Sequence, residues 1–208
     1  MARKILDITP PITTALQVYP GDTPPSREVL HDVNRGDRYT LSTLRSTVHL
    51  GAHADAPGHI RGDGRAIDAQ DLDAYVGPCQ VIQTGVGRGK ILTEDHVRIP
   101  IRAERILFGT DSFPDPDTWR EDFAGLSPGL IHHLHAQGVR LVGIDTPSVD
   151  AFTAEDLPAH RAMFRCDMAV LEGLVLNGVP EGVYELIALP LKLVGFDASP
   201  VRAILRSV

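Results

Sequence analysis

The stretch HLGAHADAPGHI, from His49 to Ile60, places metal-binding and proton-transferring side chains at alternate positions. Four such side chains share one register: His49, His53, Asp55 and His59. In a straight strand they would point to one face, but His49 and His53 would then lie about 13 Å apart. When two imidazoles bind the same zinc ion, each ligating nitrogen lies ~2.0–2.1 Å from the ion. Gly51 lies between them and can bend the backbone, so the sequence predicts a strand that kinks into a loop.

Two imidazoles and a carboxylate form a ligand set suited to Zn²⁺, and also able to hold Mn²⁺ or Co²⁺. Three protein ligands leave a coordination position open for water, which is typical of a catalytic site. A helix would also bring His49 and His53 together, as in zinc proteases, but Gly51 and Pro57 disfavour a helix here. Asp55 carries a carboxylate, which is able to bridge two ions. The pattern therefore favours a metal site over chance surface histidines.

The composition indicates one globular domain over residues 1–208, with 43% hydrophobic and 23% charged residues. The net charge of −7 disfavours nucleic-acid binding, which relies on a basic surface. Residues 1–14 are basic but lack an apolar core, and no apolar run is long enough to span a membrane, so we expect neither a secretory signal nor a membrane segment. Cys79 and Cys166 are far apart in the chain, which indicates reduced thiols and a cytoplasmic location.

Alternation and turn residues predict a mixed α/β fold with about eight or nine strands and three or four helices. A helix is expected over Ser127–Gln137, with Ser127 as N-cap, and another near Leu92–Val97 with Thr93 as N-cap. The strand-rich N-terminal half argues against a plain doubly wound sheet. The expected strands are Lys4–Ile8, Leu16–Tyr19, Tyr39–Leu50, Tyr75–Thr84, Arg105–Gly109, Val139–Ile144, Tyr184–Pro190 and Val201–Arg206.

Outside the quoted stretch, Glu172 is the most informative residue, because it lies within the apolar run MAVLEGLVL. A carboxylate in such a run must be paired, hydrogen-bonded or coordinated. His160 follows a proline and precedes Arg161, which by itself indicates an exposed loop. A second group of histidines, His132, His133 and His135, is predicted to lie on the solvated face of the helix.

Five blocks of the chain form a recognisable set: HLGAHADAPGH at 49–59, PGDTP at 20–24, GIDTPSVD at 143–150, LEGL at 171–174 and YELIALPL at 184–191. Together they resemble the cyclase-like metal-dependent hydrolases, and in particular their bacterial kynurenine formamidase (arylformamidase) branch. The resemblance implies a single-domain, strand-rich swivelling β/β/α-type fold.

This resemblance also implies a site with two Zn²⁺ ions per subunit. Five residues match the family's ligands: His49, His53 and Asp55 for the first ion, and Asp55, His160 and Glu172 for the second. His59 matches the catalytic acid/base of the family. Tyr19 takes the place of a substrate-contacting residue that is usually Trp, and it keeps a flat aromatic face.

The implied reaction converts N-formyl-L-kynurenine and water to L-kynurenine and formate, in tryptophan degradation. Metal-bound hydroxide would attack the formyl carbon, and His59 would protonate the departing arylamine nitrogen. The resemblance further suggests a homodimer. Two alternatives remain open: a related hydrolase acting on isatin, a cyclic imide or another aryl amide, and a metal-binding protein without catalysis.

Overall fold

The computed structural model describes residues 4–208, so the first three residues of the N-terminal segment considered above lie outside it. The described residues form thirteen strands, two α-helices and five short 3₁₀ helices. The helices are α1 (Pro128–Ala136) and α2 (Pro158–Arg165), with 3₁₀ turns η1 (Val33–Arg35), η2 (Pro57–His59), η3 (Ile67–Ala69), η4 (Leu72–Ala74) and η5 (Glu94–His96). The strands are β1 (Ile5–Asp7), β2 (Ser26–His31), β3 (Leu41–Arg45), β4 (His53–Asp55), β5 (Val76–Gln83), β6 (Ile91–Leu92), β7 (Arg105–Gly109), β8 (Gly125–Leu126), β9 (Leu141–Ile144), β10 (Ala169–Glu172), β11 (Gly182–Ile187), β12 (Ala198–Pro200) and β13 (Ile204–Ser207).

Nine strands form one mixed sheet in the order β1-β13-β11-β5-β7-β9-β10-β4-β12. Strands β5, β7, β9 and β10 are parallel to one another. The outer strands on both sides are antiparallel, so the sheet is not a plain doubly wound one. This confirms the expected strand-rich mixed α/β class.

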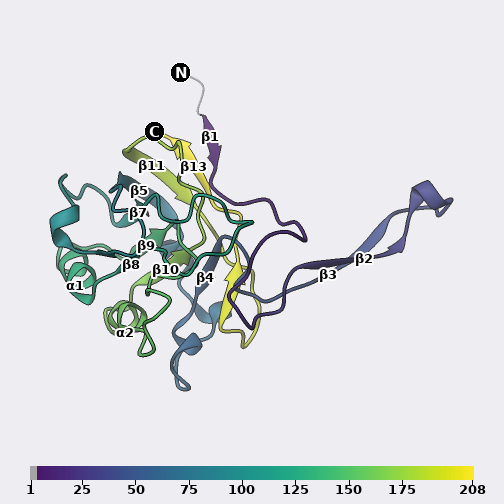
Figure 1. Ribbon diagram of the computed structural model, residues 1–208, viewed down its shortest axis with the longest axis horizontal. Helices are drawn as coiled ribbons and strands as arrows, with labels where there is room; N and C mark the ends of the chain where they lie inside the picture. The colour runs from purple at the N-terminus through teal and green to yellow at the C-terminus, as the bar shows by residue number, and fades with distance from the viewer. Residues whose placement is uncertain (1–3) are drawn as a thin grey trace.

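Successive side chains of a strand point to opposite sides of a sheet. The central strands are buried on both faces because a hydrophobic cluster covers each side. In β7, Ile106 and Phe108 pack against the apolar faces of α1 and α2, which cover the same face of the sheet (Figure 1). Leu107 packs into the second hydrophobic cluster on the other face, with residues such as Leu171 and Leu186. The two clusters hold β10, and with it the expected site, between them.

Helix α1 begins and ends at the residues that the sequence predicted. Ser127 accepts a hydrogen bond from the Leu130 amide, Pro128 is the first helical residue, and Gly138 follows the helix with a φ of +84°. The three histidines of this helix are exposed, as predicted. By contrast, the segment near Leu92–Val97 forms only the 3₁₀ turn η5, closed by a capping box between Thr93 and His96.

Two expected strands differ from the structure. Residues 16–19 form no strand, and only Leu41–Arg45 of the long run 39–50 is extended. Strand β3 pairs with β2 in a separate two-stranded arm that projects from the body (Figure 1). None of residues 26–45 is buried. The run 39–50 has β propensity, but no contact with the core determines where its strand begins and ends. No helix among residues 4–208 is long and apolar enough to cross a membrane.

Candidate metal centre

The quoted stretch folds as a bend, a short strand and a 3₁₀ turn. Gly51 has a φ of +57°, a conformation that side chains disfavour, and it turns the chain between His49 and β4. The turn brings the rings of His49 and His53 to a centroid distance of 5.1 Å, where a straight strand would separate them. The predicted kink between the two histidines is therefore confirmed.

Strand β10 delivers Glu172 to the same place, since Glu172 pairs with His53 across the antiparallel ladder. The next residue, Gly173, has a φ of +64°, and a Cβ on it would lie 2.2 Å from the Gly51 carbonyl oxygen. Only glycine allows this close approach of the two backbones. Glu172 is buried, and its Oε1 accepts a 2.6 Å hydrogen bond from the Val149 amide. The prediction that this buried carboxylate has a hydrogen-bond partner is confirmed.

His160 lies on α2 and is 2% exposed, so its placement in an exposed loop by local sequence is wrong. The N-cap residue of α2, Leu157, makes no side-chain hydrogen bond to the helix. Instead, the carboxylate of Asp150 accepts from the amides of Ala159 and His160, at 2.7 and 3.0 Å. Asp150 lies seven residues before the N-cap, in the loop that leads from β9 into α2, so the residues next to the helix start carry no capping signal.

Three histidines and two carboxylates thus meet in one buried cluster. His160 Nε2 lies 3.1 Å from Asp55 Oδ2 and 3.2 Å from Glu172 Oε1. His53 Nε2 lies 3.2 Å from Glu172 Oε2. His49 Nδ1 lies 3.0 Å from Asp55 Oδ1. All five side chains that match the ligands of the related family are brought together.

The ring nitrogens of these histidines are arranged as in metal sites. In each ring one nitrogen faces the carboxylates of the cluster and the other meets an oxygen outside it. His49 Nε2 lies 2.9 Å from Asp197 Oδ2, His53 Nδ1 lies 2.8 Å from the Gly51 carbonyl, and His160 Nδ1 lies 2.7 Å from Asp150 Oδ2. Metal-binding histidines usually donate their second ring N–H to such an acceptor, which fixes the tautomer.

The charges of the cluster are strongly coupled. Burial alone would raise the pKa of Asp55, but the hydrogen bond with His160 and the nearby imidazole of His49 hold that pKa well below its usual value. Burial would lower the pKa of His49, yet the neighbouring Asp55 and Asp197 carboxylates raise it to about 10. Asp55 Oδ1 is buried and accepts no well-directed hydrogen bond from any described residue. A ligand set with an unsatisfied, ionised oxygen at its centre fits a metal cation.

His59 lies beside this cluster on η2 and is more exposed than the other histidines, at 29% for its side chain. Its Nδ1 lies 3.3 Å from Asp197 Oδ2. One of its ring nitrogens comes within 4.8 Å of ligand atoms of Asp55 and His160. The structure therefore places His59 next to the cluster, with its ring partly open to solvent.

A cavity of about 660 Å³ opens in front of the cluster. The cluster forms one part of its lining, and aromatic side chains that include Tyr19 and Trp119 form another. Tyr19 packs edge-to-face on Trp119, with ring centroids 5.3 Å apart, and lies 5.5 Å from Phe152. Tyr19 thus lines the same cavity as the candidate ligands, although it lies 30 residues before His49 in the sequence. The three exposed histidines of α1 do not line it.

The profile of the Cyclase family matches residues 6–151 of this chain. The chain belongs to the cyclase family. One cyclase-family relative, the Kynurenine formamidase of Delftia acidovorans (strain DSM 14801 / SPH-1), is 42% identical over 210 residues, which cover 100% of both chains.

Two solved structures extend this cyclase-family similarity. One, described as a potential metal-dependent hydrolase with cyclase activity, has a TM-score of 0.86 at 31% identity, covering 100% of this chain and 99% of its own. The other, isatin hydrolase A from Labrenzia aggregata, has a TM-score of 0.84 at 25% identity, covering 99% of this chain and 94% of its own. The chain thus has the fold of the cyclase family, and its histidine and aspartate clusters are consistent with a metal-dependent hydrolase.

Three residues of this cyclase-family site are not indicated by sequence reasoning: Asp150, Asp197 and Trp119. Asp150 lies in the block GIDTPSVD, which drew attention as a whole but not to this carboxylate. Asp197 precedes the three-residue strand β12, in a segment without a motif. Trp119 is the only tryptophan of the chain, which is the one signal that could have singled it out.

Proposed function

We propose that this cyclase-family enzyme is a kynurenine formamidase, which hydrolyses N-formyl-L-kynurenine to L-kynurenine and formate in tryptophan degradation. The buried histidine–carboxylate cluster, which faces aromatic side chains across one cavity, carries the proposal. A formanilide presents a carbonyl group for the cluster and an aryl ring for the aromatic side chains. The full-length relative named Kynurenine formamidase supports this substrate. A cytoplasmic location is part of the proposal, in keeping with the two free cysteines, Cys79 and Cys166.

We further propose that the cluster holds two zinc ions. The first would be bound by His49, His53 and Asp55, and the second by Asp55, His160 and Glu172. Three imidazoles and two carboxylates suit Zn²⁺, with Mn²⁺ or Co²⁺ as substitutes. Asp55 Oδ1 is buried without a hydrogen-bond partner among the described residues, so it would be available to a cation. When bound, zinc supplies a Lewis acid for the formyl carbonyl and lowers the pKa of water.

The side chains of the chain itself would perform the remaining steps. In hydrolysis the formyl carbon–nitrogen bond breaks, and water supplies the new carbon–oxygen bond. His59 would give the proton that the departing arylamine nitrogen needs, as a general acid. Its partial exposure lets the ring recover a proton from solvent. Asp55 and Glu172 stay ionised, since their pKa values are lowered despite burial, and so remain available as ligands.

A comparison of substrates tests the proposed reaction, because a second candidate is supported by a specific finding. The chain shares its fold and 25% identity with an isatin hydrolase, which suggests the cyclic amide isatin as the alternative substrate. With zinc-loaded protein we expect kcat/KM for N-formyl-L-kynurenine to exceed that for isatin by at least about 100-fold, equivalent to about 2.7 kcal/mol in transition-state binding. A preference for isatin, or inertness toward both, would contradict the assignment.

Tyr19 is proposed to contact the aryl ring of the substrate. Tyr19→Ala removes one aromatic face, so we expect KM for N-formyl-L-kynurenine to rise about tenfold, with kcat changed less than about threefold, in steady-state assays. Tyr19→Phe and Tyr19→Trp are matched controls that keep the ring and should stay within about threefold of wild-type KM. An unchanged KM in Tyr19→Ala would remove Tyr19 from the substrate site.

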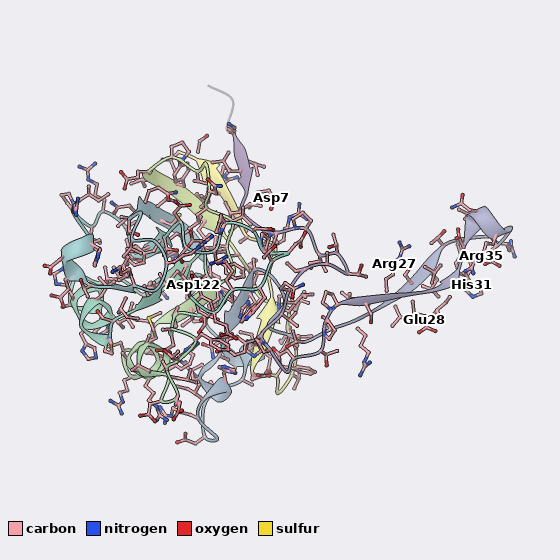
Figure 2. All side chains as sticks on the ribbon, in the orientation of Figure 1. Asp7, Arg27, Glu28, His31, Arg35 and Asp122 are labelled. Atoms are coloured by element: carbon pink, nitrogen blue, oxygen red, sulfur yellow. The ribbon has the colours of Figure 1, made fainter. Side chains whose placement is uncertain are left out.

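A homodimer is also proposed, and the β2–β3 arm supports it. Two-stranded hairpins are marginally stable alone in water, yet this arm exposes apolar side chains far from the body. Its four arginines outnumber its three acidic residues, whereas the whole chain carries −7. The arm is therefore slightly basic, and we propose that it docks on the acidic body of a second copy. Arg27, Glu28, His31 and Arg35 lie along the arm in Figure 2.

Leu44, which is 60% exposed on the arm, provides the test. We expect the 22.6 kDa chain to run as a dimer in light scattering after gel filtration. Leu44→Glu should weaken the dimer at least about tenfold, because a charge would enter an apolar interface. Leu72→Glu, at an equally exposed leucine on the body, is the control. A monomeric wild type, or equal behaviour of the two variants, would contradict a role of the arm.

A further inference from the structure

The carboxylate of Asp197 contacts two histidines of the quoted stretch at the same time. Its Oδ2 lies 2.9 Å from His49 Nε2 and 3.3 Å from His59 Nδ1. The two imidazole rings are themselves close, with centroids 4.4 Å apart. One oxygen therefore links a proposed metal ligand to the proposed proton donor.

The position of Asp197 is fixed by the sheet. Strand β12 pairs with β4 so that Ala198 is opposite Asp55. One residue further, the Ala56 amide donates a 2.9 Å hydrogen bond to the Asp197 carbonyl. This hydrogen bond ties the backbone of Asp197 to the strand that carries Asp55, so the Asp197 carboxylate is held next to that strand.

At His49, Asp197 contacts the ring nitrogen that faces away from the cluster, and Nδ1 remains free to face Asp55 Oδ1, at 3.0 Å. His59 meets Asp197 through Nδ1. A ring nitrogen of His59 also lies within 4.8 Å of ligand atoms of Asp55 and His160. An N–H donated to a carboxylate fixes which ring nitrogen carries the proton and how the ring is turned. Asp197 is thus placed to fix both rings, through His49 Nε2 and His59 Nδ1.

We infer that Asp197 is a positioning residue that orients the metal-binding ring of His49 and the acid/base ring of His59 through one shared carboxylate oxygen. The part concerning His59 rests on the proposed function. The Asp197 side chain is 45% exposed, so it has no need of this partnership to satisfy a buried charge. Asp197 together with His49 and His59 could instead bind a metal ion directly, since their ligand atoms lie within 4.8 Å of one another.

The test uses Asp197→Asn in the full-length, zinc-loaded protein, with the exposed Asp122→Asn as matched control. We expect kcat on N-formyl-L-kynurenine to fall about 10- to 100-fold while KM changes less than about threefold. Zinc affinity, measured by competition with a chelator, should fall about 10-fold or more. ¹⁵N NMR at fixed pH should show His59 protonated on Nδ1 in the wild type and a mixture of tautomers in the variant. A purely structural role would change unfolding without changing the tautomer.

Two results would overturn the inference. One is an Asp197→Asn protein with wild-type kcat and an unchanged His59 tautomer. The other is the loss of a whole equivalent of zinc, which would make Asp197 a ligand. If the wild type itself fails to hydrolyse N-formyl-L-kynurenine, the proposed reaction fails, but the tautomer and the zinc affinity still decide whether Asp197 positions the two rings.

Discussion

His59→Ala should lower kcat on N-formyl-L-kynurenine by about 10³-fold and leave the zinc content unchanged. General acid catalysis by a positioned side chain contributes typically 10²–10⁴-fold, and the arylamine nitrogen must gain a proton as it leaves. His59 is placed beside the cluster rather than within it: its Nδ1 meets Asp197, and its ring is partly exposed, whereas His53 and His160 are buried. Steady-state kinetics and metal analysis of the same preparation measure both quantities.

His132→Ala is the matched control for this variant, because His132 is an exposed histidine on α1 and does not line the cavity. It should keep wild-type turnover and zinc content. The decisive contradiction would be a His59→Ala protein that loses zinc, since His59 would then be a ligand. Wild-type turnover in His59→Ala would equally exclude it as the proton donor.

Asp55→Asn should abolish measurable turnover and reduce the bound zinc from two ions to at most one. Asp55 is the ligand proposed to be shared by both ions, and it meets His49 through one oxygen and His160 through the other. An amide has nearly the same shape but no charge, so it removes the anion that both sides share. The metal-free variant should also unfold more easily, by about 3 kcal/mol, because protonated His49 and His160 would lose a buried partner.

Zinc content, turnover and denaturant unfolding of the metal-free protein measure these effects. Asp7→Asn serves as the control, since Asp7 pairs with Arg202 at the surface, away from the cluster. An Asp55→Asn protein that retains two zinc ions would contradict a bridging role. Turnover near the wild-type level would contradict the whole ligand assignment.

Sequence reasoning succeeded where the determinants are local. Gly51 predicted a bend between His49 and His53, and in the structure this glycine turns the chain with a φ of +57°. Ser127 and Pro128 marked the start of α1 within one residue. Glu172 in its apolar run required a partner, and the structure gives it His53 and His160. In each case a neighbouring residue or a short pattern carried the physical cause.

It failed where the cause lies beyond the immediate neighbours of a residue. Helix α2 starts after Leu157 in a left-handed conformation and is capped by Asp150, seven residues before Leu157, so His160 could not be placed from the residues beside it. Strand β12 has three residues, and its pairing with β4 brings Asp197 to the site. The proposed ligands Asp55, His160 and Glu172 were grouped by family resemblance, because no spacing rule connects them.

The central claim is that hydrolysis of N-formyl-L-kynurenine depends on two metal ions held by the cluster around Asp55. The most direct measurement is turnover of this substrate as zinc is added stepwise to chelator-treated protein, with bound metal determined at each step. We predict negligible turnover without metal and a plateau at two zinc ions per chain. Full activity in the metal-free protein, or a zinc-saturated protein that leaves N-formyl-L-kynurenine intact, would contradict this account.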